Sequence, residues 1–331
     1  AIQPAINAAV DGDEIRVSAG TFVEQLNINK RVSIIGAGKD GANPTIVQST
    51  SSPTILLGAT GTIGDPIIFK DLQIQGRGGI RTTITPIDYF TIDNVWLKAS
   101  TLYSGEGFRL VTGHQMTHLT IANSIIEGFI DGIIIEKTPG TGDAGTKLDY
   151  VSITDTTFTN NRRKGIYVET LSNAVFTNVS LIDNGFVQPE TTLADAHSAG
   201  IDINLKDGAY SNLQFINMTA TGNGLGTSQG AALMIKARDD GTTYGANPAT
   251  LTNVTITGGT FTGNERGIRI GEPNKTNAGP TNVVIHGASL LGNVKTYVGT
   301  DLSAYGDVVN YSLAMVDATG NWWGSDAGPA A

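Results

Sequence analysis

Several residue types and patterns are missing from this chain of 331 residues. It has no cysteine, which excludes a disulfide scaffold, a cysteine-based zinc site and a cysteine nucleophile. No apolar run approaches the roughly 18 residues that a membrane-spanning helix needs, so none is expected. Positive charge is scarce, and the formal net charge of −9 argues against nucleic acid and anionic membrane surfaces as main partners. The opening AIQPAINAAV lacks the charged and apolar regions of a signal peptide, so we expect a mature or excised fragment.

Glycine is abundant, with 42 residues, and one short pattern recurs around it. In NRRKGIYVET (161–170), a glycine is followed by residues that alternate between apolar and polar. Such alternation predicts a β-strand with Ile and Val directed towards a core. The same Gly-apolar-x-apolar pattern occurs at Gly107–Leu110, Gly132–Ile135, Gly165–Val168, Gly200–Ile203 and Gly267–Ile270.

Each of these strands belongs to a longer repeated unit. A turn follows, then a second strand such as 178–183, 253–258 or 282–287, and then a short segment that ends in asparagine. A unit this short cannot bury its apolar face alone, so stacked copies are expected. Asparagine tolerates the left-handed conformation of a tight corner, and stacked asparagine side chains can bond to one another. The repeated asparagines are Asn160, Asn184, Asn223, Asn264, Asn293 and Asn321, and their unequal spacing indicates insertions.

A stack of this kind needs covers at both ends, because open edges invite aggregation. Helical periodicity is almost absent, except in the first ten residues, where Ile2, Ile6 and Val10 share one helical face. We therefore expect a short amphipathic helix over the first coil. At the other end, Trp322 and Trp323 offer two large rings to cover the last coil.

The two ends of the chain carry a family resemblance. Residues 11–17 (DGDEIRV), with the Gly-Thr-Phe at 20–22, resemble the first coil of right-handed parallel β-helix proteins of the pectate-lyase-like superfamily. Residues 316–325 (VDATGNWWGS) resemble the last coil of β-helix domains in bacterial secreted and cell-surface proteins. The resemblance implies an all-β, right-handed parallel β-helix solenoid of about ten coils with a short N-terminal capping helix. It also implies an extracellular or cell-surface setting and the handling of polysaccharide.

We expect one β-helix domain over 1–331. Within it, residues 1–12 form the N-terminal cap, 13–315 the coils and 316–331 the C-terminal coil and cap. No complete catalytic motif of this superfamily is found: Lys98 and Ala99 stand where pectate lyases have an Asp-His pair, and Arg238-Asp239-Asp240-Gly241 is only superficially similar to polygalacturonases. A named pectinolytic activity is therefore not predicted.

Stacking turns equivalent positions of successive coils into columns about 4.8 Å apart. Four insertions, at 137–147, 185–199, 237–249 and 271–280, border the column of Gly-apolar-x-apolar strands. Loops that rise beside one strip of a solenoid build a groove that suits an extended glycan. Two outward columns are predicted: Arg109, Ile134, Tyr167, Asp202, Met234 and Arg269 in one, and Val111, Glu136, Glu169, Asn204, Lys236 and Gly271 in the other.

Candidate catalytic residues come from these columns. Asp202 is the central candidate acid or base, with Glu169 and Glu136 as partners one and two coils away. Carboxylates on adjacent coils would be roughly 5 to 10 Å apart, a range of distances that includes both retaining and inverting glycosidases. Lys236 is a candidate base for β-elimination if its pKa is lowered, and with Arg238 and Arg269 it could bind uronic acid carboxylates. The remaining candidates are Tyr167 and His197 for proton transfer or sugar stacking and Asn204 for substrate binding.

Simpler interpretations compete with these. Outward Glu, Lys and Arg on adjacent strands commonly form cross-strand pairs on a solvated face. No cofactor is required. Asp143, Asp239 and Asp240 could bind calcium, but no D-x-D-x-D-G loop is present, which favours turn-forming aspartate. Two functions stay open. The first is a polysaccharide-handling β-helix, either a lyase or glycosidase or a module that only binds the glycan in the same groove. The second is a non-catalytic structural or adhesive segment of a larger surface protein with flanking domains.

Overall fold

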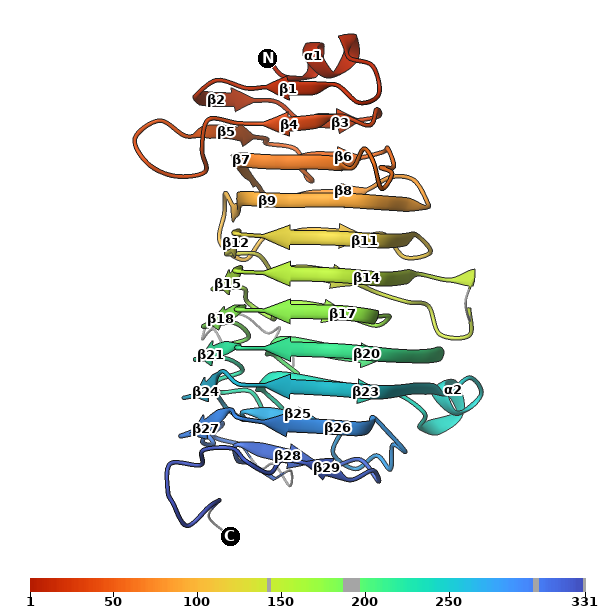
Figure 1. The fold of residues 1–331 in the computed structure, drawn as a ribbon, viewed down its shortest axis with the longest axis vertical. Coiled ribbons are helices and arrows are strands. Elements are labelled where there is room, and N and C mark those ends of the chain that lie inside the picture. The colour runs from red at the N-terminus through yellow and green to blue at the C-terminus, as the bar shows by residue number, and fades with distance from the viewer. Residues whose placement is uncertain (142–143, 187–196, 300–303, 330–331) are drawn as a thin grey trace.

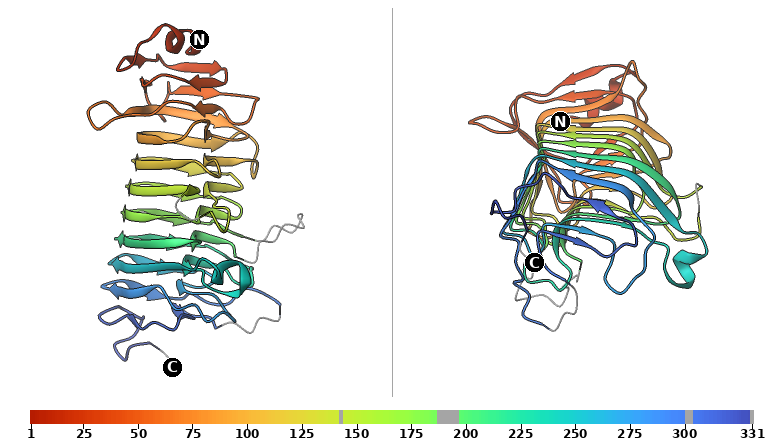
Figure 2. Two further views of the ribbon diagram at one scale, coloured as in Figure 1. Left: turned by 90° about the vertical axis from the view of Figure 1, so that its right-hand side faces the viewer. Right: turned by 60° about the horizontal axis from the view of Figure 1, so that its bottom comes forward.

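The computed structural model describes residues 1–141, 144–186, 197–299 and 304–329. In this part of the chain, 19 strands form one sheet and 10 strands form another, and both sheets run the length of the molecule (Figure 1). Strands of successive coils pair in parallel. The side view in Figure 2 shows the coils stacked evenly along the long axis. This is a parallel β-helix, as the repeat predicted.

The shorter sheet contains the Gly-apolar-x-apolar strands. Its members are β3 (Leu26–Ile28), β6 (Ile55–Leu57), β8 (Ile80–Thr82), β10 (Glu106–Leu110), β13 (Asp131–Ile135), β16 (Lys164–Val168), β19 (Ala199–Leu205), β22 (Ala231–Ala237), β25 (Ile268–Ile270) and β28 (Val308–Asn310). We call this sheet the site sheet, because the candidate residues lie on and beside it.

The longer sheet is bent into two halves. One half consists of β1 (Glu14–Arg16), β4 (Ser33–Ile35), β11 (Gln115–Ala122), β14 (Lys147–Thr154), β17 (Ser172–Thr177), β20 (Gly208–Ile216), β23 (Ala249–Thr257), β26 (Thr281–His286) and β29 (Val316–Asp317). The other consists of β2 (Gly20–Val23), β5 (Thr45–Gln48), β12 (Ile125–Glu127), β15 (Thr157–Thr159), β18 (Ser180–Ile182), β21 (Thr219–Thr221), β24 (Thr260–Thr262) and β27 (Ser289–Leu291). The strands β7 (Ile67–Gly76) and β9 (Ile87–Ala99) run through both halves.

Residues with positive φ make the bend. Asn94, Asn123 and Asn178 have φ of 54°, 51° and 53° and lie at this corner in three coils. Asparagine adopts this left-handed region more readily than other side chains do, because its short amide bonds locally. The bend gives each coil three β faces around one apolar core, in which Phe176 and Phe215 stack at 4.9 Å between ring centroids.

A ladder of buried asparagines lines the turn before the site sheet. Each Nδ2 donates to the Oδ1 of the next coil, at 2.9, 3.0, 2.9 and 2.8 Å, along Asn161, Asn184, Asn223, Asn264 and Asn293. The ladder ends where Asn293 donates to Asp307 at 2.6 Å. The sequence prediction of this ladder needs two corrections. Its first member is Asn161 and not Asn160. Asn321 lies outside the ladder and accepts from the Ala288 amide.

Both ends of the stack are covered, in part as predicted. The helix α1 (Gln3–Ala8) packs on the first coil and buries Ile6, and Ile2, directly before the helix, is buried as well. The Glu24 carboxylate accepts hydrogen bonds from the backbone amides of Ile2 and Gln3 at 2.6 and 2.9 Å, and so satisfies the first free amides of the helix. Val10 is 66% exposed, because the helix ends before it, so its assignment to the buried face was wrong. At the other end Trp323 packs against the core, whereas Trp322 is 47% exposed. The second helix, α2 (Gly241–Gly245), lies in an insertion after β22.

Candidate functional site

The pairing register of the site sheet places four predicted residues in one column. Tyr167 on β16 pairs with Asp202 on β19, Asp202 with Met234 on β22, and Met234 with Arg269 on β25. Two residues further along, Asn204 pairs with Lys236. The glycine spacing therefore predicted the register correctly.

These outward side chains are buried rather than solvated. Asp202, Lys236 and Arg269 are 1%, 2% and 0% exposed. Segments between the strands cover them: Arg269 donates to the Gln229 carbonyl at 2.8 Å from beneath the turn before β22. The interpretation of the charges as pairs on a solvated face is thus wrong for Lys236 and Arg269, which are buried, but it holds for the partly exposed Arg109 and Glu136.

Asp202 lies at the centre of a charge cluster. Its Oδ1 is 2.9 Å from Lys236 Nζ, and its Oδ2 is 3.8 Å from Lys164 Nζ. Burial raises the pKa of Asp202, but the ammonium groups of Lys236 and Lys164 outweigh it, so the pKa lies below its usual range. Burial, with repulsion from Arg269, lowers the pKa of Lys236 although Asp202 opposes the shift. The carboxylate is held ionised, while the lysine is brought closer to neutrality.

The cluster opens into a pocket of about 200 Å³, which we call the Asp202 pocket. A cavity of this size is smaller than a typical site for a drug-sized ligand and fits a single small group such as one sugar unit. Its lining residues are Lys164, Tyr167, His197, Asp202, Asn204, Lys236, Arg238 and Glu272.

One side of the pocket is closed by Tyr167 and its partners. The Tyr167 hydroxyl donates to Glu169 Oε1 and accepts from Asn204 Nδ2 at 3.1 Å. Burial, with the carboxylates of Glu169 and Asp202, raises the pKa of Tyr167 well above its usual range, so the hydroxyl stays protonated. Glu169 itself also bonds Lys206 and the Lys137 amide, and does not line the pocket.

The opposite side is an ion network between three insertions. His197 Nε2 lies 3.4 Å from Glu272 Oε1, and Arg238 Nη1 lies 3.2 Å from Glu272 Oε2. Arg238 also bonds Asp240 through Nε at 2.7 Å and stacks on the Tyr244 ring. Burial raises the pKa of Glu272, but His197, Lys236 and Arg238 outweigh it and lower the pKa to about 2. The network fixes the pocket wall and holds Glu272 ionised.

Three predicted site residues do not line the pocket, namely Glu169, Glu136 and Arg269. Glu136 is paired with Arg109 at 3.1 Å on the neighbouring coils, and its side chain is 42% exposed. Arg269 lies behind the pocket under its loop cover. The predicted partnership of Glu136 with Asp202 is therefore wrong, since the Arg109 guanidinium holds it elsewhere.

Sequence reasoning missed two lining residues, Lys164 and Glu272. Lys164 opens strand β16, directly before the glycine that marks the repeat, and Glu272 follows Gly271 at the end of β25. Both positions border the column, so the position of each residue in the repeat could have identified it as a candidate.

The predicted calcium ligands have other partners. Asp240 bonds Arg238 and lies 3.2 Å from Lys275, and Asp239 accepts from Asn277 and from the Ala278 amide. Asp143 and most of the 185–199 insertion lie outside the described residues. In the described ranges, no group of three His, Cys, Asp or Glu side chains is placed to hold a metal ion, and no helix is long and apolar enough to cross a membrane.

Comparison with known proteins found similar solved structures only. No family model and no curated protein matches the sequence. Among solved structures, the catalytic domain of a GH87 α-1,3-glucanase is 14% identical with a TM-score of 0.44, over 95% of this chain and 62% of that one. An alginate lyase from Paenibacillus is 15% identical (TM-score 0.38, 93% and 96% covered), and a tailspike domain of bacteriophage CBA120 is 11% identical (TM-score 0.46, 95% and 44% covered).

The chain is a parallel β-helix protein. The uninterrupted parallel sheets carry this assignment. This β-helix spans less than two thirds of the glucanase domain. Identities this low bear on the fold alone, so its activity has to be argued from its own pocket.

Proposed function

We propose that this β-helix binds an acidic, uronate-containing polysaccharide at the Asp202 pocket and cleaves it by β-elimination. The observation that carries the proposal is the excess of cations in the pocket. When Lys236 is neutral, as the reaction requires, Lys164 and Arg238 still face the carboxylates of Asp202 and Glu272, and Arg269, close enough to repel a Lys236 ammonium, adds a third cation. In a chain of net charge −9, this concentration of positive charge favours an anionic sugar.

The carboxylates argue against hydrolysis. A glycosidase needs a carboxylic acid that stays protonated near neutral pH, which requires a raised pKa. Asp202 and Glu272 both have lowered pKa values, because cations surround them. Neither is suited to protonate a leaving oxygen.

Lys236 and Tyr167 fit the two proton transfers of a β-elimination. Neutral Lys236 removes the proton on the carbon next to the uronate carboxyl group. The electron pair of that C–H bond forms the new C=C double bond, and the C–O bond to the leaving sugar breaks. Tyr167 lines the pocket with a protonated hydroxyl, which turns from Glu169 to the departing oxygen and gives it the proton.

The other lining residues bind and orient. Arg238 and Lys164 neutralise the uronate carboxylate, which stabilises the negative charge that develops there. Asp202 holds Lys236 in place, and Glu272 orients the His197 ring. Asn204 fixes the Tyr167 hydroxyl through its bond at 3.1 Å.

The setting follows from the substrate. Acidic polysaccharides of this kind belong to cell walls, capsules and matrices, so we propose that the protein acts outside the cell or on its surface. We also propose that flanking domains of a longer chain accompany it.

Product mass spectrometry tests the proposal on a panel of uronate-containing and neutral polysaccharides. We expect unsaturated oligosaccharides from an acidic polymer, strongly reduced in Lys236→Ala and in Tyr167→Phe. Saturated products lost in Asp202→Asn would establish a glycosidase instead. If every polymer stays intact, the protein is a binding or adhesive segment and the catalytic assignment fails.

A further inference from the structure

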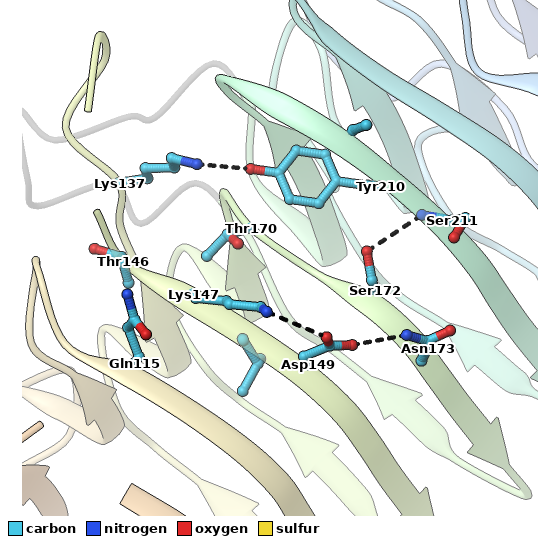
Figure 3. Close-up of a pocket in the computed structure, with 12 residues that line it drawn as sticks. Gln115, Lys137, Thr146, Lys147, Asp149, Thr170, Ser172, Asn173, Tyr210 and Ser211 are labelled. Atoms are coloured by element: carbon cyan, nitrogen blue, oxygen red, sulfur yellow. Dashed lines mark hydrogen bonds and ion pairs between the residues drawn. The ribbon is translucent and has the colours of Figure 1, made fainter. Parts of the chain in front are cut away.

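A second pocket, of about 330 Å³, lies where strands β14, β17 and β20 begin (Figure 3). We call it the Lys137 pocket. No function derived so far uses it. Its polar lining groups include Lys137, Asp149, Thr170, Ser172, Asn173 and Ser211.

These groups are held in fixed positions. Lys137 Nζ reaches across the pocket to donate to the Asp207 carbonyl at 2.6 Å and to the Tyr210 hydroxyl at 3.1 Å. Asn173 Nδ2 donates to Asp149 Oδ1 at 2.9 Å, as Figure 3 shows. Because Lys137, Asp149 and Asn173 are positioned by bonds to other parts of the chain, this side of the pocket is formed before any ligand enters.

The lining matches the chemistry of a sugar. Hydroxyl groups of Thr170, Ser172 and Ser211 can each donate and accept, as the hydroxyls of a sugar ring do. A site for an apolar ligand would be lined mainly by hydrophobic and aromatic side chains, which are the minority here. Lys137 and Lys147 outnumber the single carboxylate, Asp149, so an acidic sugar is accommodated as well.

One residue connects this pocket to the Asp202 pocket. Glu169 accepts from the Lys137 amide at 2.6 Å through Oε2 and from the Tyr167 hydroxyl through Oε1. Lys137 lines the second pocket and Tyr167 lines the first. The two pockets thus lie on either side of a single buried carboxylate.

We propose that the Lys137 pocket binds a further uronate unit of the polysaccharide held at the Asp202 pocket. This proposal rests on the proposed function for the identity of the glycan. A chain that occupies both pockets gains affinity from the second contact without any change at the reacting bond.

Ser211→Trp and Ser211→Ala form a matched pair for the test. Ser211 lines the Lys137 pocket, where an indole would fill the cavity, while alanine removes only the hydroxyl. For each protein, titration calorimetry measures the affinity for a uronate disaccharide and octasaccharide, and steady-state rates give kcat and KM on the polymer. We expect Ser211→Trp to weaken octasaccharide binding and raise the polymer KM about tenfold, the effect of one or two lost hydrogen bonds.

Disaccharide affinity and kcat should be unchanged in Ser211→Trp, and Ser211→Ala, which loses one hydroxyl but keeps the cavity open, should weaken octasaccharide binding less than Ser211→Trp does. Cleavage with equal polymer KM in all three proteins would overturn the second site and leave the proposed function standing. Octasaccharide binding that Ser211→Trp weakens, without any cleavage, would support the site and refute the β-elimination. If the unaltered protein binds neither oligosaccharide, both proposals fail.

Discussion

Lys236 Nζ lies 2.9 Å from Asp202 Oδ1 on the adjacent strand, and their side chains are only 2% and 1% exposed. An ion pair this deeply buried is stable only as a pair, because either charge alone would be left without water or a partner. It joins two neighbouring coils in the middle of the site sheet. The same two residues therefore contribute both to the stability of the stack and to the proposed reaction in the pocket.

Removing one partner of this pair should cost more than removing both. Asp202→Asn leaves the Lys236 ammonium uncompensated, and we expect a loss of about 3–5 kcal/mol in unfolding free energy. The double variant Asp202→Asn/Lys236→Met should recover a large part of it. Urea unfolding measures both, with Glu14→Gln as the control, since the Glu14–Arg16 pair is 46% and 79% exposed and should change stability by less than about 1 kcal/mol. Equal losses in the single and double variants would contradict this account.

The buried asparagine ladder should be stability-critical at its middle rung. Asn223→Ala removes the donor to Asn264 Oδ1 and to the Leu181 carbonyl, and the acceptor for Asn184 Nδ2. Leaving buried polar groups unsatisfied costs about 1–3 kcal/mol, which thermal or urea unfolding resolves. Thr255→Ala, a half-exposed strand position, is the control and should cost clearly less. A loss in Asn223→Ala no greater than in the control would show that the ladder does not hold the coils.

The pH dependence of cleavage should report Lys236. Its pKa is lowered from 10.5, and the amine must be neutral to act as base, so the rate should rise with pH below 10.5. Arg269 repels the ammonium, hence Arg269→Met should raise the Lys236 pKa and move this rise to higher pH. Arg269→Lys keeps the charge and should leave the profile nearly unchanged. A profile insensitive to Arg269→Met would remove Lys236 from the role of base.

Acid should weaken the protein through Glu272. Its pKa falls from 4.5 to about 2 on folding, so its contribution to stability is complete above 4.5 and is lost as the pH drops towards 2. Unfolding free energies of the unaltered protein and Glu272→Gln should therefore differ most near neutral pH and converge towards pH 2. A gap that stays constant from neutral pH to pH 2 would argue against an ionised Glu272 in the wall of the pocket.

The sequence predicted the coils and their register well, because both depend on local patterns. Gly165, Gly200 and Gly267 each lie next to the first residue of a strand of the site sheet, so the pairing of Tyr167 with Asp202 could be derived by counting from glycine. Alternation of Ile and Val with polar residues fixed which side chains reach the core.

Burial of the site could not be derived in the same way. Whether Arg269 and Lys236 are solvated depends on how non-repetitive loops fold over the sheet, and such loops carry no periodicity. For the same reason, the His197–Glu272 contact between two distant insertions was not foreseen. The fold follows from the repeat, whereas the pocket follows from the insertions.

The central claim is that the Asp202 pocket recognises the negative charge of a uronate. Titration calorimetry with an acidic polysaccharide and with the same polymer after chemical reduction of its carboxyl groups tests this most directly, since the two ligands differ only in charge. We predict tight binding of the native polymer, weakened by salt and by Arg238→Gln, and weak binding of the reduced one. Equal affinity for both polymers would contradict the claim.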